Sequence, residues 1–190
     1  RIPSMKEYPK ITPPIVTRAP EGGFHPYARD EKRLARMWAL PGTKGVEHRV
    51  GGLEKDSLSG AVSHDPENHE RMVGLRAAKV ARVQDFIPKQ EVVGGRRGEL
   101  LVVGWGGTYG HLLTAVRELQ RRGEQVSLCH FNFIHPLPRG VREIFSRFRR
   151  IVVCELNSGQ FAGYLRQQFQ EFEFLQYNKI QGLPFTCLLY

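Results

Sequence analysis

The stretch Glu99-Leu-Leu-Val-Val-Gly-Trp-Gly-Gly-Thr-Tyr-Gly110 decides the fold of this chain. Leu100 to Val103 form a short apolar run without polar alternation, which predicts a strand covered on both faces. The glycines that follow predict a tight turn, and apolar residues at helical spacing between positions 112 and 119 predict a helix that ends at Gly123. A strand, a glycine-rich turn and a helix in this order are typical of a parallel α/β domain.

The same pattern recurs towards the C-terminus. Residues 126–133 and 151–155 are two further apolar stretches that predict buried strands. Apolar side chains at helical spacing follow each of them, with Phe148 in the first predicted helix and Phe169 in the second. Alternating acidic and aromatic residues at 171–174 predict a fourth, more exposed strand. We therefore predict the α/β fold class, with an open, mostly parallel sheet and helices on both of its faces.

The chain before this region is built differently, and we predict three segments. Residues 1–64 hold most of the prolines and no readable buried strand, so they are predicted to be a Pro/Gly-rich arm or linker. Asp65-Pro-Glu67 has the form of a helix start, which predicts one helix followed by a polar hinge over residues 65–97. Residues 98–190 form the predicted α/β domain.

Composition excludes several classes of protein. No segment of the 190 residues approaches the ~20 apolar residues of a membrane span, and no secretory leader is visible. Cys129, Cys154 and Cys187 are too few and too scattered for a disulfide framework or a metal ribbon, so we expect reduced thiols in the cytoplasm. The net charge of +9 is spread along the chain without a nucleic-acid-binding motif. An acidic protein partner, a phosphate-bearing ligand and a solvated face remain open as interpretations of this charge.

The glycine-rich turn is only a near match to a dinucleotide-binding loop. Gly104 and Gly106 match the start of that fingerprint, but its third glycine would stand where the chain has Tyr109. The next predicted strand also ends without the acidic residue that binds a ribose. A structural tight turn is the favoured interpretation, and a stand-alone nucleotide- or coenzyme-A-binding module that uses Gly104 to Gly110 is the alternative.

The residues predict no catalytic or metal-binding constellation. Glu155, at the end of a predicted strand, is the best-placed acid–base candidate, although a carboxylate that accepts hydrogen bonds from the next turn is the favoured interpretation. Ser158 lacks the glycine two positions earlier that a nucleophile elbow needs. His64 and His69 are five residues apart and share no helical face, which disfavours a metal site.

Six strings in the chain together carry a family resemblance. They are Pro41-Gly-Thr-Lys-Gly45, His48-Arg-Val-Gly-Gly-Leu-Glu-Lys-Asp56, Asp65-Pro-Glu-Asn-His69, Val103-Gly-Trp-Gly-Gly-Thr-Tyr-Gly110, Glu155-Leu-Asn-Ser-Gly-Gln160 and Tyr177-Asn-Lys-Ile-Gln-Gly-Leu-Pro-Phe185. In this order they resemble the C-terminal part of the α subunit of 2-oxoglutarate:ferredoxin oxidoreductase, in the 2-oxoacid:acceptor oxidoreductase family. The resemblance implies that the α/β domain is similar to the C-terminal domain of transketolase, and that the arm joins it to a domain absent from this sequence.

The resemblance also implies the activity of a larger complex, a 2-oxoglutarate synthase. Such an enzyme oxidatively decarboxylates a 2-oxoacid on thiamine diphosphate, transfers the acyl group to coenzyme A and passes electrons through a [4Fe–4S] cluster to ferredoxin. In that family the diphosphate, its Mg²⁺ and the cluster belong to the β subunit. We therefore expect no cofactor, metal or catalytic residue in this chain, and no activity from the chain alone.

A structural role is what the resemblance leaves for this chain. The expected partners are the remainder of the α subunit, the β subunit and, for the complex, ferredoxin; nucleic acid and membrane are not expected. Polar groups in glycine-containing turns are the candidates for domain or subunit contacts: Thr108, Tyr109, Asn157, Gln160, Tyr177, Asn178, Lys179 and Gln181. Hydrogen bonds of these side chains within their own loops are the alternative interpretation.

Overall fold

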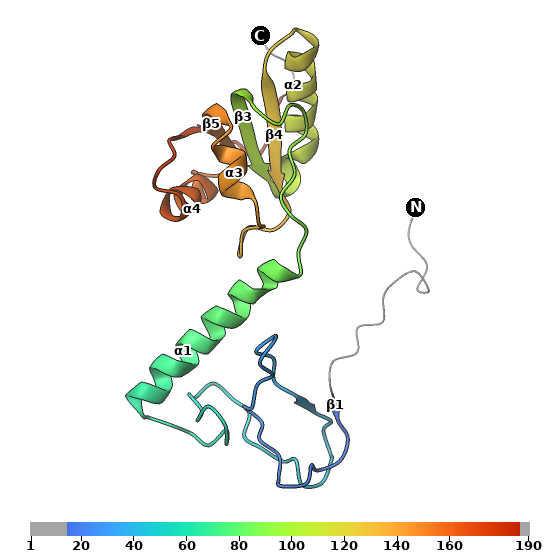
Figure 1. Cartoon of the computed structure of the whole chain (residues 1–190), viewed down its shortest axis with the longest axis vertical. Coiled ribbons are helices and arrows are strands. Elements are labelled where there is room, and N and C mark those ends of the chain that lie inside the picture. The colour runs from blue at the N-terminus through green and yellow to red at the C-terminus, as the bar shows by residue number, and fades with distance from the viewer. Residues whose placement is uncertain (1–14, 187–190) are drawn as a thin grey trace, which may run out of the picture. The chain divides into compact units, whose positions relative to one another are not determined.

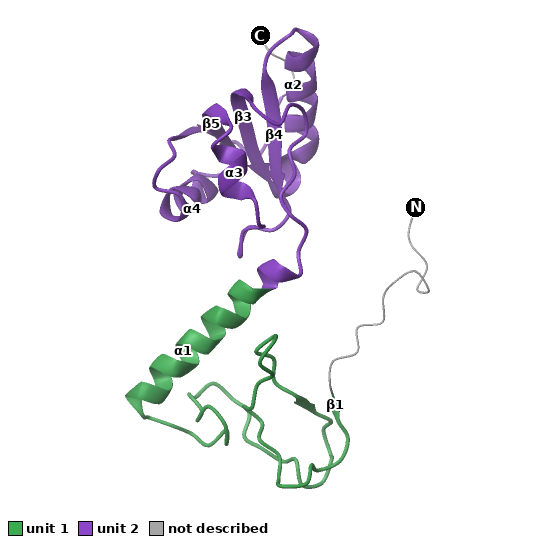
Figure 2. Cartoon of the chain, viewed as in Figure 1, with its two compact units in different colours: residues 1–82 green, residues 83–190 purple. Residues whose placement is uncertain are grey.

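The structure is a computed structural model that describes residues 15–186, and it divides into two compact units, residues 1–82 and 83–190 (Figures 1 and 2). Cys187 lies outside the described residues, so the expectation for this thiol stays a prediction. In the part of the chain that is described, no helix has the length and apolar character needed to cross a membrane.

The second unit is built on a parallel sheet (Figure 1). Its four strands are β3 (Gly98–Trp105), β4 (Val126–Phe131), β5 (Phe148–Glu155) and β6 (Phe174–Asn178). They lie in the order β4-β3-β5-β6, and all three neighbouring pairs are parallel. The predicted α/β fold class is therefore confirmed.

Helices cover both faces of this sheet. The helix α2 (Tyr109–Arg121) packs Leu112 and Val116 on the face that carries Val102 of β3. The helices α3 (Val141–Phe145) and α4 (Gln160–Gln168) pack on the opposite face. This arrangement follows from the buried strands, whose alternate side chains point to opposite faces and need cover on each. Gly123 ends α2 with a φ of +88°, as its position predicts.

Several predicted elements had the wrong bounds, and the strand predicted over 126–133 ends at Phe131. Phe148 does not continue the helix before it, because α3 ends at Phe145 and Phe148 pairs with Gly98 as the first residue of β5. The fourth strand runs from Phe174 to Asn178 rather than over 171–174. Phe172 precedes it, and its ring packs on Phe145 at 5.8 Å between centroids. Both aromatic residues are placed by tertiary packing, which overrides the local pattern.

The first unit has little regular structure apart from one helix, α1 (Pro66–Ala81), which a short 3₁₀ turn, η2 (Arg82–Asp85), follows. Asp65 caps α1 by accepting a hydrogen bond from the backbone N–H of Asn68 at 2.6 Å, as predicted. The side chain of Asn68 in turn donates to the carbonyl of Lys55 at 2.8 Å, which fastens the arm to α1. Two-residue strands, β1 (Ile15–Val16) and β2 (Trp38–Ala39), pair in the arm.

Candidate functional site

The candidate site lies at the carboxyl ends of the parallel strands. The chain leaves β3, the first strand of the sheet, for β4 on one side, and later crosses to β5 on the other side. Ligands of open α/β sheets gather beside the strand ends where the strand order reverses in this way. The loops after Trp105 and Glu155 flank this point, and the predicted contact residues lie in these loops, at the first residues of α2 and α4, and at the end of β6 and in the segment after it.

Two glycines in the turn after β3 have a local structural reason. A Cβ on Gly104 would lie 2.3 Å from a methyl carbon of Leu112 and 2.8 Å from the hydroxyl oxygen of Thr108. Thr108 is buried, and its hydroxyl donates to the carbonyl of Trp105 at 2.9 Å. Gly106 begins the 3₁₀ turn η3 (Gly106–Thr108) with a φ of +59°. Close approach and a left-handed backbone therefore account for these two glycines.

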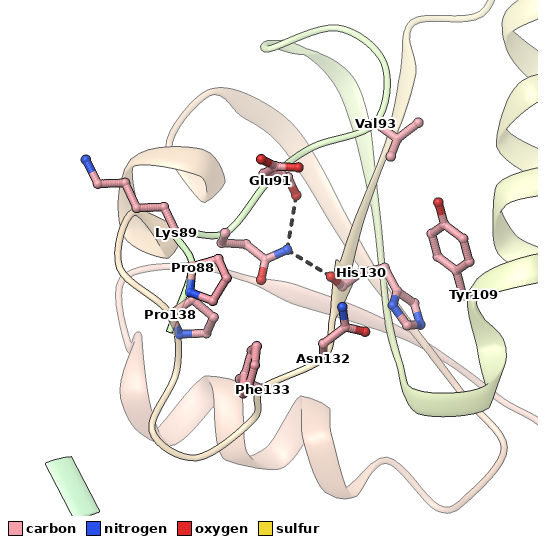
Figure 3. A pocket seen from close by; sticks show the side chains of 10 residues that line it. Pro88, Lys89, Glu91, Val93, Tyr109, His130, Asn132, Phe133 and Pro138 are labelled. Carbon is pink, nitrogen blue, oxygen red and sulfur yellow. Dashed lines mark hydrogen bonds between the residues drawn. The ribbon is translucent and has the colours of Figure 1, made fainter. Parts of the chain in front are cut away.

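A pocket of about 500 Å³ opens beside this turn (Figure 3). Tyr109, at the start of α2, stands edge-on to the ring of His130 at 5.0 Å, and Asn132 and Phe133 follow from the end of β4. The far wall is the segment 88–93, where the amide of Gln90 donates to the carbonyl of His130 at 2.9 Å. The pocket thus combines aromatic and amide groups from three parts of the chain.

His130 is a histidine in the lining of this pocket. Burial lowers the pKa of its imidazole, against the opposing effect of hydrogen bonds with the backbone of Gly106 and Trp105. The ring is therefore neutral at physiological pH and can bind through hydrogen bonds. Sequence reasoning missed His130, Asn132 and Gln90, because only the fold brings residues 90 and 130 together.

Glu155 is fully buried and closes the end of β5. Its carboxylate accepts hydrogen bonds from the backbone N–H groups of Phe161 and Ala162, each at 2.9 Å, and from the indole N–H of Trp105 at 3.3 Å. The carboxylate thus caps the first turn of α4 and compensates its dipole. This confirms the interpretation of Glu155 as an acceptor from the next turn, and a phosphate at this helix end would meet a negative charge.

Three of the predicted contact residues make hydrogen bonds within their own loops: Thr108, as described above, Asn157 and Lys179. The side chain of Asn157 accepts from the N–H of Gly159 at 2.7 Å and of Gln160 at 3.2 Å, which forms the turn into α4. The ammonium of Lys179 donates to the carbonyl of Pro184 at 2.6 Å. These bonds set the shape of the loops and leave a contact role for them as a prediction.

The remaining candidates divide between two places. Thr108 and Tyr109 lie at the turn after β3, where Tyr109 lines the pocket. Asn178 pairs with Glu155 in the register of β5 and β6. The second place is therefore the carboxyl end of these two strands, where the candidates between Asn157 and Gln181 lie. Tyr177 leaves 56% of its surface exposed, although its ring contacts Phe185 at 5.6 Å between centroids.

Comparisons with known proteins agree on one family of enzymes. No protein-family model matches the chain. The chain is 39% identical over 188 residues to "2-oxoglutarate oxidoreductase subunit KorA" of Mycobacterium tuberculosis, an alignment that covers 98% of this chain. It is 26% identical over 160 residues, or 84% of this chain, to "2-oxoglutarate synthase subunit KorA" of Methanothermobacter marburgensis. The chain spans 28% of the length of the first relative and 41% of the second.

A solved structure shares the fold. It is 2-oxoglutarate:ferredoxin oxidoreductase from Magnetococcus marinus with 2-oxoglutarate, coenzyme A and succinyl-CoA bound. The match has a TM-score of 0.79 at 28% identity and covers 88% of this chain and 29% of that chain. These findings confirm the resemblance that the six sequence strings indicated.

Proposed function

We propose that this chain, a relative of the α subunits of 2-oxoacid:ferredoxin oxidoreductases, supplies the C-terminal α/β part of such a subunit. The observation that carries the proposal is the end-to-end alignment with a 2-oxoglutarate oxidoreductase subunit over 98% of this chain. A shared fold at a TM-score of 0.79 supports it independently of any single motif. The chain itself has a structural role in holding domains and subunits together.

The complete enzyme would oxidatively decarboxylate a 2-oxoacid, with 2-oxoglutarate as the proposed substrate, and transfer the acyl group to coenzyme A. The names of the relatives support the substrate and the electron acceptor, ferredoxin. Thiamine diphosphate, Mg²⁺ and the [4Fe–4S] cluster belong to this proposal through the family resemblance alone. A cytoplasmic location is part of the same proposal.

The two described cysteines lack the character of iron–sulfur ligands. An iron–sulfur cluster needs several cysteine thiolates. Burial raises the pKa of Cys129 to about 12 and that of Cys154 to about 11, which favours the protonated thiols inside the sheet. Among residues 15–186, no group of three or more His, Cys, Asp or Glu side chains could hold a metal ion. A purely structural role for this chain, without a catalytic residue, is part of the proposal.

We propose that the strand-end loops are the contact surface towards the other domains or the β subunit. Exposed side chains such as Tyr177, Gln160 and Gln181 point to a surface available for burial. The segments 1–64, 65–97 and 98–190 remain our proposed domain division, while backbone contacts alone divide the chain at 82/83. This boundary falls between α1 and the predicted hinge.

The first experiment is co-expression of this chain with the remainder of the α subunit and the β subunit. Affinity purification would report assembly, and 2-oxoglutarate- and coenzyme-A-dependent reduction of ferredoxin would report turnover. Activity that requires this chain would support the proposal, whereas full activity without it would refute it.

The contact residues need separate variants in the assembled complex. We expect Asn178→Ala combined with Lys179→Ala to weaken assembly or lower turnover, because the two residues lie at the carboxyl end of β6, in the proposed contact surface. Arg149→Ala is the matched control, since Arg149 is exposed near the amino end of β5 and, among residues 15–186, its ion-pair partner is Glu99. Unchanged assembly and turnover in the double variant would contradict the contact role.

A further inference from the structure

The first unit contains a strongly basic pocket that the proposed function does not use. It has a volume of about 630 Å³ and lies between the arm and α1. Its lining includes five cationic side chains, namely Arg29, Arg36, Lys55, Arg76 and Lys79. Among the described residues of the lining, Glu54 is the one acidic side chain. The pocket therefore holds a large excess of positive charge in one unit of the chain.

Glu54 neutralises only one edge of this pocket. Its carboxylate pairs with the guanidinium of Arg76 at 3.3 Å and with the imidazole of His69 at 2.9 Å. Hydrogen bonds from Arg76 and then from His69 lower the pKa of Glu54 to about 2. Within residues 15–186, no carboxylate forms an ion pair with Arg29, Arg36, Lys55 or Lys79.

Lys55 is the most telling of these cations, because only 3% of its surface is exposed. Its ammonium donates to the backbone carbonyls of Leu53 at 2.5 Å and Gly51 at 3.4 Å. Carbonyl dipoles solvate an ammonium but do not neutralise its charge. A buried cation without a counter-ion is costly, so such groups are normally paired or bind a ligand of opposite charge.

Arg29 adds a second unbalanced group. Its Nε is buried and has no hydrogen-bond partner in the described part of the chain, while another nitrogen of the guanidinium donates to the carbonyl of Leu34 at 3.0 Å. Burial and then the charges of Arg36 and Arg76 lower the pKa of Arg29. Arg36 is held with its guanidinium 4.3 Å above the ring of Tyr27. A donor without a partner beside fixed guanidinium groups is a group that a bound anion would satisfy as acceptor.

We infer that this pocket binds a polyanion of the phosphate class, such as a diphosphate group. A ligand with two or more negative charges would offset part of the charge of the four cations that Glu54 does not reach. Phosphate oxygens fit arginine donors in pairs, and Lys55 would add a point charge at the base. The inference concerns binding by this unit alone and stands apart from the reaction of the complex.

The test is calorimetric titration of the full chain with inorganic pyrophosphate at low ionic strength. We expect saturable one-to-one binding that weakens at least tenfold in Lys55→Met and in Arg36→Gln. Arg149→Gln, which removes an exposed cation from the second unit, should bind pyrophosphate as the parent does. Circular dichroism checks that each variant is folded, and Arg36→Gln carries the test if Lys55→Met is not.

Two results would overturn the inference. One is the absence of saturable pyrophosphate binding, or equal weakening in Arg149→Gln, because either would reduce the effect to general charge attraction. The other is citrate binding that is as tight as pyrophosphate binding and equally sensitive to Arg36→Gln, because the pocket would then not distinguish phosphates from carboxylates.

Discussion

Replacement of Glu155 by alanine should strongly destabilise the second unit. The change removes the acceptor of three hydrogen bonds, two from the buried N–H groups of Phe161 and Ala162 and one from the indole of Trp105. Each buried donor that is left unpaired costs about 1–3 kcal/mol. Entry of water into the space would offset part of this cost. We therefore expect a loss of about 3–5 kcal/mol, and about 1–2 kcal/mol for Glu155→Gln, which keeps one acceptor.

Urea unfolding followed by tryptophan fluorescence measures this loss. The chain has two tryptophans, and Trp38→Phe, at a residue that is 64% exposed, would leave Trp105 as the reporter of the second unit. A denaturant slope of about 1.5 kcal/mol per molar urea converts the expected loss for Glu155→Ala into a midpoint shift of about 2–3 M. Glu99→Ala is the exposed control, with an expected change within about 0.5 kcal/mol. A Glu155→Ala shift as small as that of the control would refute the capping argument.

Three further predictions concern other parts of the chain. Gly159→Ala should destabilise the second unit by about 1–2 kcal/mol in urea unfolding, because the φ of Gly159 is +95° and an added Cβ would lie 2.6 Å from the side-chain nitrogen of Gln176 in β6. Gly163→Ala is the control: this glycine lies inside α4 with open space around it, so the change should be neutral or stabilising. The pKa of Glu54 is near 2 in place of 4.5, so the stabilisation that the ionised carboxylate gives through Arg76 should be present above about pH 4.5 and lost as the pH falls towards 2. An NMR titration of Arg76→Gln should show a higher pKa for Glu54, and an unchanged pKa would contradict the pairing. Burial raises the pKa of Cys129 to about 12, so this thiol should resist alkylation at pH 8 in the folded chain and react in urea. Peptide mass spectrometry measures the labelling, and rapid labelling of the native protein would contradict the prediction.

Local sequence was sufficient for the parts of the fold that depend on neighbouring residues. The run at 100–103 and the glycines after it predicted β3 and its turn, because burial on both faces and a positive φ each demand particular residue types. Asp65 and Pro66 predicted the start of α1 for the same reason, since a cap needs only the next three residues. The six strings indicated the family because each is a short run of neighbouring residues, which requires no contact between distant parts of the chain.

Tertiary structure decided the features that join distant residues. Phe172 precedes β6 because its ring packs on Phe145, a contact that no local period reveals. Glu155 caps a helix because the turn after it brings the N–H groups of α4 back to the end of β5. The unbalanced charge around Lys55 exists only because the arm folds onto α1. Side-chain packing and electrostatics act through space, whereas a sequence pattern records only the order of residues along the chain.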